Sequence, residues 1–81
     1  MIELVRSYAI AERWEVESSH GVQRVRERRI SFRDVKHALM SGTRCAVQPN
    51  GRWRLDSQDL EGDELTLILF VDDGVLIITL Y

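Results

Sequence analysis

The chain has 81 residues, of which 44% are hydrophobic and 30% charged, with a formal net charge of −2 at pH 7. This length predicts one domain, and a domain so small buries only about 60% of the surface that its unfolded chain exposes, so we expect a thin core and a partner that covers further apolar surface. Cys45 is the only cysteine, which excludes a small secreted domain held together by disulfides. The sequence shows neither an export signal nor an apolar run long enough to span a bilayer, so we expect a cytoplasmic domain without membrane contact.

The start of the chain predicts a helix followed by a short strand. Residues 2–12 place Ile2, Val5 and Ala9 at i, i+3 and i+7 without glycine or proline, which is the pattern of a helix with one apolar face. Residues 14–17 alternate apolar and polar side chains, and this alternation suits a short edge strand.

Two further helices are expected before the middle of the chain. The first of them should span about residues 19–28. The next begins after Ser31, which stands three residues before Asp34 as in a capping box, and Gly42 stands where a left-handed residue would end it. Its expected apolar stripe consists of Phe32, Val35 and Leu39.

After Gly42 the sequence pattern changes from helical to alternating. Asn50-Gly51 and Asp73-Gly74 accept the positive φ angles of tight hairpin turns and therefore indicate antiparallel pairing. Four strands are expected, at residues 43–48, 52–56 with an extension to 60, 64–71 and 75–81. The last two are almost wholly apolar, so they should be central strands of the sheet.

These elements predict an α+β domain, residues 1–81, in which N-terminal helices pack on one face of a C-terminal antiparallel sheet of about four strands. Three short helices are too few to cover both faces of such a sheet. We therefore expect the free face to meet a partner protein or a second copy of the chain, as a homo-oligomer through the sheet.

The net charge conceals three blocks of alternating sign. Residues 1–19 carry −2, residues 20–54 carry nine basic and two acidic side chains for a net +7, and residues 55–81 carry −7 with no basic residue. The middle block predicts attraction to a polyanion, although pairing with the acidic last block would cancel part of it.

Within the middle block, His20, Arg24 and Arg28 fall at i, i+4 and i+8 and form one polar ridge on the expected second helix, opposite Val22 and Val25. One guanidinium group can bind two phosphate oxygens at once, and an imidazole can transfer a proton near neutral pH. Cleavage of RNA through its 2′-hydroxyl needs cations that stabilise the charge on the phosphate and a group that transfers a proton. These three residues are therefore candidate catalytic groups. The alternative is that the ridge is an ordinary solvated face and His20 a polar residue at a helix start.

Further cations and one phenol extend this candidate surface. Arg52 and Arg54 alternate with apolar residues on one strand, so both should point to one face. The alternative is that they pair with acidic neighbours across the strands. Tyr81 offers a ring for stacking on a base, or else packs at the rim of the sheet. The candidate RNA-binding residues are Arg26, Arg29, Arg52, Arg54 and Tyr81.

Metal and cofactor chemistry finds no support in the sequence. His20, His37 and Cys45 lack the spacing of metal ligands, and no phosphate loop, dinucleotide fingerprint or nucleophile elbow is present. Cys45 alternates with Val47 on an expected strand, which indicates a buried, unreactive thiol. We expect no metal and no cofactor.

Residues 19–31 read S-H-G-V-Q-R-V-R-E-R-R-I-S. They resemble the H-A-x-x-R-M-x-x-R-G-I-S signature of a widespread bacterial domain of unknown function, and Asp72-Asp73-Gly74 with the apolar strand after it is similar to the closing hairpin of that family. The resemblance covers nearly the whole chain. The signature positions that match are His20, Arg24 and Arg28, and those that differ are Gly21, Val25 and Arg29.

The resemblance implies a fold similar to that of RelE-like and BrnT-like toxins, in which helices pack on one side of an antiparallel sheet. It also implies the toxin component of a type II toxin-antitoxin pair that acts on RNA and is neutralised by a cognate antitoxin protein. At Arg29 the signature has glycine, and a helix-ending left-handed residue there costs about 1 kcal/mol more than glycine does.

Two functions follow from the sequence. The first is such an RNA-directed toxin, and if it is an enzyme at all, we expect a metal-independent endoribonuclease. The second is a non-catalytic interaction or regulatory module whose arginine ridge binds an acidic partner.

Overall fold

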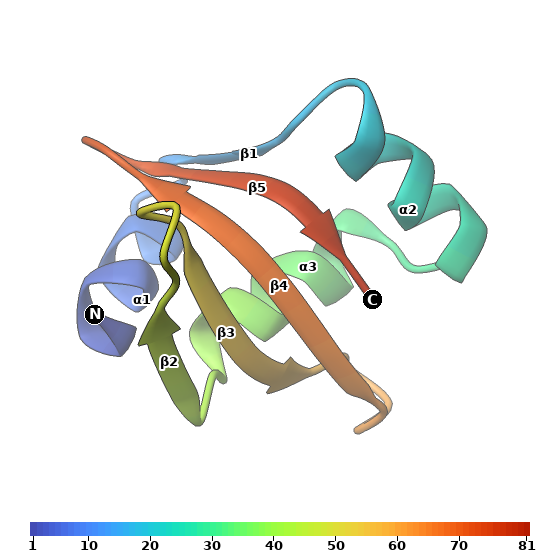
Figure 1. Cartoon of the computed structure of the whole chain (residues 1–81). Helices are drawn as coiled ribbons and strands as arrows, with labels where there is room; N and C mark the ends of the chain where they lie inside the picture. The colour runs from blue at the N-terminus through green and yellow to red at the C-terminus, as the bar shows by residue number, and fades with distance from the viewer.

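The computed structural model describes the backbone of all 81 residues and every side chain except that of residue 20. It contains three helices and a five-stranded sheet. In chain order the elements are α1 (Ile2–Ile10), β1 (Trp14–Val16), α2 (His20–Arg28), α3 (Phe32–Met40), β2 (Arg44–Val47), β3 (Trp53–Gln58), β4 (Glu64–Val71) and β5 (Val75–Leu80). Figure 1 shows α1 and α3 on the far side of the sheet, and α2 apart from them beside β5.

The sheet is mixed, with strand order β1-β5-β4-β3-β2. Strands β2 to β5 pair antiparallel, as predicted, and β4 and β5 lie in the interior of the sheet. The predicted sheet is one strand short and not wholly antiparallel, because β1, which forms at the predicted short edge strand of residues 14–17, joins the sheet as a fifth strand and runs parallel to β5. A hairpin fixes the direction of each later strand, whereas most of the chain separates β1 from β5, so no turn sets the direction of β1.

The core lies between one face of the sheet and helices α1 and α3. The side chains with almost no exposure include, on the sheet, Leu55, Leu65, Leu67, Leu69, Ile77 and Leu80, and, on the two helices, Val5, Ala9, Val35, Ala38 and Leu39. The alternate positions of β4 and β5 point to the opposite face, where Phe70 is 46% exposed. The prediction that the helices leave one face of the sheet uncovered agrees with this arrangement.

The predicted packing of both helices of residues 19–41 on one face is met in part: Val25 of α2 belongs to the same buried core as Val35 and Leu39 of α3, but α2 lies beside β5 at the edge of the sheet. It packs chiefly against β5. Strand β1 pairs only with Val75, Leu76 and Ile77, and its continuation ends with the amide of Glu17 donating to the carbonyl of Ile77 at 2.8 Å. The rest of the β5 edge is therefore free of a strand, and α2 occupies it.

Gly21 permits this close approach of α2 to β5. A Cβ atom at residue 21 would lie 2.6 Å from Cγ1 of Val16 and 3.0 Å from the carbonyl oxygen of Ile77. Both distances are shorter than ordinary van der Waals contact. The structure thus gives a reason for glycine where the signature that residues 19–31 resemble has alanine.

The start of α3 confirms the predicted capping box. The amide of Asp34 donates to Oγ of Ser31 at 3.1 Å, and the carboxylate of Asp34 accepts from the Ser31 amide at 2.9 Å. The same carboxylate accepts from the amide of Leu60 at 3.1 Å, which ties the helix to the turn before β4. These backbone donors, from Ser31 and Leu60, lower the pKa of Asp34 because they stabilise its charged form. The predicted apolar stripe is wrong at Phe32, which is 56% exposed, whereas Val35 and Leu39 are buried.

Gly42 has a role other than the predicted left-handed helix stop. It does not have a positive φ angle, and α3 ends instead at Ser41 without a left-handed residue. A Cβ atom at residue 42 would lie 3.0 Å from Cγ of Leu55 and would collide with its Cδ1. Glycine is therefore required by the fully buried Leu55 of β3, since any larger residue overpacks the core.

We expect Gly42→Ala to lower the free energy of unfolding by about 1–3 kcal/mol, the usual cost of overpacking. Urea denaturation of the two proteins measures this difference. The double variant Gly42→Ala/Leu55→Ala should lose less than the sum of the two single losses, because the shortened side chain makes room for the new methyl group. Strict additivity of the two losses would contradict the proposed clash.

Candidate functional site

Helix α2 carries the densest group of cations in the structure. Val25 is buried at 6% exposure and holds one side of the helix on the core, while Val22 is half-buried. Arg24, Arg26 and Arg28 are all exposed. The predicted division of this helix into an apolar side and an arginine-bearing side is therefore confirmed. The prediction of His20 as a catalytic group lies outside the described side chains.

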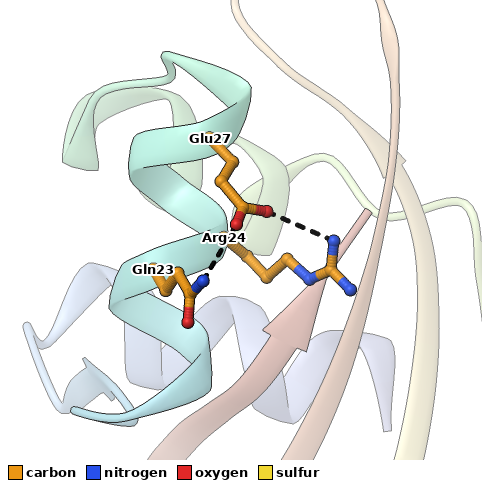
Figure 2. Close-up of polar contacts among 3 residues, drawn as sticks. All are labelled: Gln23, Arg24 and Glu27. Carbon is orange, nitrogen blue, oxygen red and sulfur yellow. Dashed lines mark hydrogen bonds and ion pairs between the residues drawn. The ribbon is translucent and has the colours of Figure 1, made fainter.

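The two described members of the ridge each have a hydrogen-bond acceptor. Nη1 of Arg24 lies 3.3 Å from Oε2 of Glu27, and Nε2 of Gln23 donates to Oε1 of the same carboxylate at 3.0 Å. Figure 2 shows the carboxylate of Glu27 accepting from both side chains at once. Nη2 of Arg28 donates to the carbonyl of Glu64 at 3.3 Å, at the first residue of β4. Arg28 thus connects the end of α2 to the sheet.

Arg26 and Arg29 lie on the same helix end and are exposed. Among the described side chains, neither they nor Arg28 forms an ion pair with a carboxylate. Basic residues in the last turn are favourable for the helix, because they face the partial negative charge of its carboxyl end. Arg26 and Arg29 therefore remain available to an anionic ligand, and Arg28 keeps the donors that do not bind the Glu64 carbonyl.

Arg29 has the left-handed conformation expected at this position, with φ of 54° and ψ of 37°. Its amide donates to the carbonyl of Arg26 at 3.1 Å, and the next amide, of Ile30, donates to Val25 at 3.3 Å. This hydrogen bonding closes the end of α2 as glycine commonly does. The Cβ atom of Arg29 is the source of strain, since glycine adopts the same angles without cost.

We expect Arg29→Gly to raise the free energy of unfolding by about 1 kcal/mol, because it removes this strain. Arg29→Ala is the matched control, since it removes the same charge and keeps the Cβ atom. Thermal or urea unfolding of the three proteins measures the difference. If the glycine and alanine variants are equally stable, the left-handed conformation costs nothing and the expectation is wrong.

The remaining predicted residues lie on the uncovered face of the sheet or at its margin. Arg54 is exposed on β3, and its Nε lies 3.0 Å from Oδ1 of Asp56, two residues further along the same strand. Asp56, and to a lesser extent Tyr81, raise the pKa of Arg54 by stabilising its charge. Arg52 precedes β3, where its amide donates to Oδ1 of Asn50 in the hairpin turn.

Three of the predicted residues follow one another along β4. Arg28 contacts the carbonyl of Glu64. Tyr81 exchanges both backbone hydrogen bonds with Thr66, at 2.7 and 2.9 Å, and its side chain is 51% exposed. Arg54 pairs in register with Ile68. Positions 66 and 68 of a strand share one face, so Tyr81 and Arg54 lie on the uncovered face, while Arg28 reaches the backbone of β4 at the end of this row. We call this series of Arg28, Tyr81 and Arg54 the β4 track.

Sequence reasoning missed Arg44. It is exposed on β2, and its register partner across the strands is Asp56, which also binds Arg54. Together with Ala46 these residues line a shallow hollow on the uncovered face. The alternation of Arg44 and Ala46 with Cys45 and Val47 was a signal that Arg44 shares the face of Arg54.

Cys45 of β2 is half-buried. Burial raises the pKa of the Cys45 thiol and so favours its protonated, less nucleophilic form. Within the described residues, no three histidine, cysteine, aspartate or glutamate side chains lie close enough together to hold a metal ion. None of the described helices is long and apolar enough to cross a membrane.

Comparison of the chain with protein-family models, with curated proteins and with solved structures finds no match. The class that the structure itself defines is an α+β domain with helices on one face of a mixed five-stranded sheet and a cationic helix at its edge. The resemblance of residues 19–31 to a toxin-like signature stays a prediction.

Proposed function

We propose that the protein acts on RNA as the toxin-like member of a toxin-antitoxin pair. The observation that carries the proposal is the β4 track, which extends from the arginines of α2 across the uncovered face of the sheet. Guanidinium groups separated by an exposed aromatic ring suit a single-stranded nucleic acid, because cations bind its phosphates and a ring stacks on a base.

The residues have separate roles in this proposal. Arg24, Arg26, Arg28 and Arg29 bind phosphate oxygens, and Tyr81 stacks on a base. Cleavage, where it takes place, proceeds by attack of the RNA 2′-oxygen on the adjacent phosphorus, which expels the 5′-oxygen of the next nucleotide and leaves a 2′,3′-cyclic phosphate. His20 moves the proton that leaves the 2′-hydroxyl or the one that joins the 5′-oxygen.

The experiment that tests the proposal is regulated expression of the chain alone in a bacterial host. We expect growth arrest accompanied by RNA fragments with 2′,3′-cyclic phosphate ends, and we expect a variant lacking His20, Arg24 and Arg28 to produce neither. Normal growth with intact RNA, from soluble folded protein, would contradict the proposal.

A second function, a non-catalytic module that binds an acidic protein, is favoured by a different observation. Arg24 and Arg54 each lie next to a carboxylate of the same element, Glu27 and Asp56, and these two pairs support the binding of carboxylate groups at this surface. An acidic segment of a partner would replace these two side chains. Under this function the purified chain binds an acidic peptide more tightly than a single-stranded RNA of equal charge, and expression does not cut RNA.

A further inference from the structure

A pocket is lined by residues of β1, of the adjoining ends of β4 and β5, and of the turn between them. Figure 1 shows this end of the sheet away from helix α2. The volume of the pocket is about 310 Å³. Glu15 of β1, Phe70 of β4, Leu76 of β5 and Asp72 of the turn contribute to its lining. None of these residues belongs to the surface proposed for RNA.

The charges around the pocket are unbalanced. Arg13 is already bound, since its Nη2 lies 2.8 Å from Oδ2 of Asp73 and donates to the Asp73 carbonyl at 2.9 Å. Its guanidinium also lies 5.9 Å from the centre of the Tyr8 ring. Glu15 and Asp72 form no ion pair within the described side chains, and both are exposed. The pocket therefore presents two uncompensated carboxylates.

The wall between these carboxylates is apolar. Phe70 and Leu76 are register partners on β4 and β5, so their side chains stand next to each other on the uncovered face. Phe70 is 46% exposed although it is a large aromatic residue. An exposed aromatic ring beside carboxylates favours a cation carried on an aliphatic stem, because the stem packs on the apolar wall and the ring face attracts the charge.

We propose that this pocket binds an arginine side chain from an extended basic segment of a partner protein. The volume is at the lower limit of small-molecule sites, which suits one long side chain better than a cofactor. Strand β1 is at the edge of the sheet, so an extended segment reaches the pocket without displacing any part of the fold. The charge of the partner is opposite to that of RNA, and the proposal is independent of the function assigned to α2.

The test uses the whole chain and two synthetic peptides, acetyl-Gly-Val-Arg-Val-Gly-amide and the same peptide with citrulline in place of arginine. Citrulline keeps the shape of arginine and removes its charge. Titration is followed by the amide signals of isotopically labelled protein. We expect saturable shifts around residues 15, 70 and 76 with the arginine peptide, and binding at least about five-fold weaker with the citrulline peptide.

The second part of the test measures binding of the arginine peptide by variants of the pocket residues. Glu15→Gln/Asp72→Asn should weaken binding of the arginine peptide about five-fold, and Phe70→Ala should weaken it by a few-fold. Glu61→Gln is the matched control, since it removes an exposed carboxylate from the turn between β3 and β4 and should change nothing. All of the replaced side chains are exposed, so the variants should fold.

Three results would overturn the proposal. The first is equal binding of the two peptides, and the second is equal binding by the pocket variants and the Glu61→Gln control. The third is a dimer in sedimentation experiments that dissociates in the Glu15→Gln/Asp72→Asn variant, since a second copy of the chain would then be the occupant.

Discussion

Leu67→Ala should lower the free energy of unfolding by about 2–5 kcal/mol, the range for truncating a fully buried leucine. Leu67 has no exposed surface and stands between Leu55 of β3 and Leu80 of β5 in the sheet register, both of which are also fully buried. A domain of this size has a total stability of about 4–12 kcal/mol. The substitution therefore removes a large part of it, and urea or thermal unfolding should show a shifted midpoint.

Ile68→Ala is the matched control for Leu67→Ala, because it truncates the next residue of the same strand on the other face. Ile68 is half-buried and points to the uncovered side of the sheet. We expect its loss to cost less than about 1.5 kcal/mol, since less of its apolar surface leaves water on folding. Equal losses in the two variants would mean that the uncovered face is also buried, for example by self-association.

The hairpins of the second half were the most predictable part of the fold. Residues 64–71 match β4 in both bounds, and β5 ends one residue earlier than expected. The reason is local: Asp73 adopts a φ of 54° in the turn between them, a conformation that aspartate followed by glycine tolerates. Short-range chemistry of this kind is visible in the sequence.

Features that depend on distant parts of the chain were not predictable. The parallel pairing of β1 with β5 and the position of α2 at the edge of β5 both arise from contacts between segments about fifty to sixty residues apart. Gly42 shows the same limit, because its neighbour Leu55 comes from another element and no local pattern signals that contact. A glycine after a helix fits both a left-handed stop and a close approach, and the sequence favoured the wrong one.

The candidate site likewise has features that could be predicted from the local sequence and features that depend on distant parts of the chain. The spacing of Arg24 and Arg28 on one helix was readable from periodicity. The approach of Arg28 to the start of β4, and the order of Arg28, Tyr81 and Arg54 along that strand, required the sheet register. Pairing of Arg54 with an acidic neighbour was foreseen as an alternative, and the structure shows it along the strand with Asp56 rather than across strands.

His20→Ala and Arg24→Ala should affect RNA in different ways if α2 acts as proposed. Arg24→Ala should weaken binding and lower the slope of log affinity against log salt by about 0.7, since it removes one phosphate contact to a single strand and its released counterion. His20→Ala should leave affinity nearly unchanged and slow cleavage by about 100-fold or more, the scale for losing a general acid or base. Salt-dependent binding assays and single-turnover cleavage measure the two effects.

Two further variants separate a specific surface from general electrostatic attraction. Glu27→Gln removes the carboxylate that holds Arg24, so it should strengthen RNA binding where Arg24→Ala weakens it. Arg33→Ala removes another exposed guanidinium, on α3 and outside the candidate site, and should change binding much less than Arg24→Ala does. If Arg33→Ala and Arg24→Ala weaken binding equally, net charge alone attracts the RNA and α2 holds no site. If all variants fold and RNA binding is unchanged throughout, the arginines of α2 are an ordinary solvated surface and the RNA-directed function is wrong.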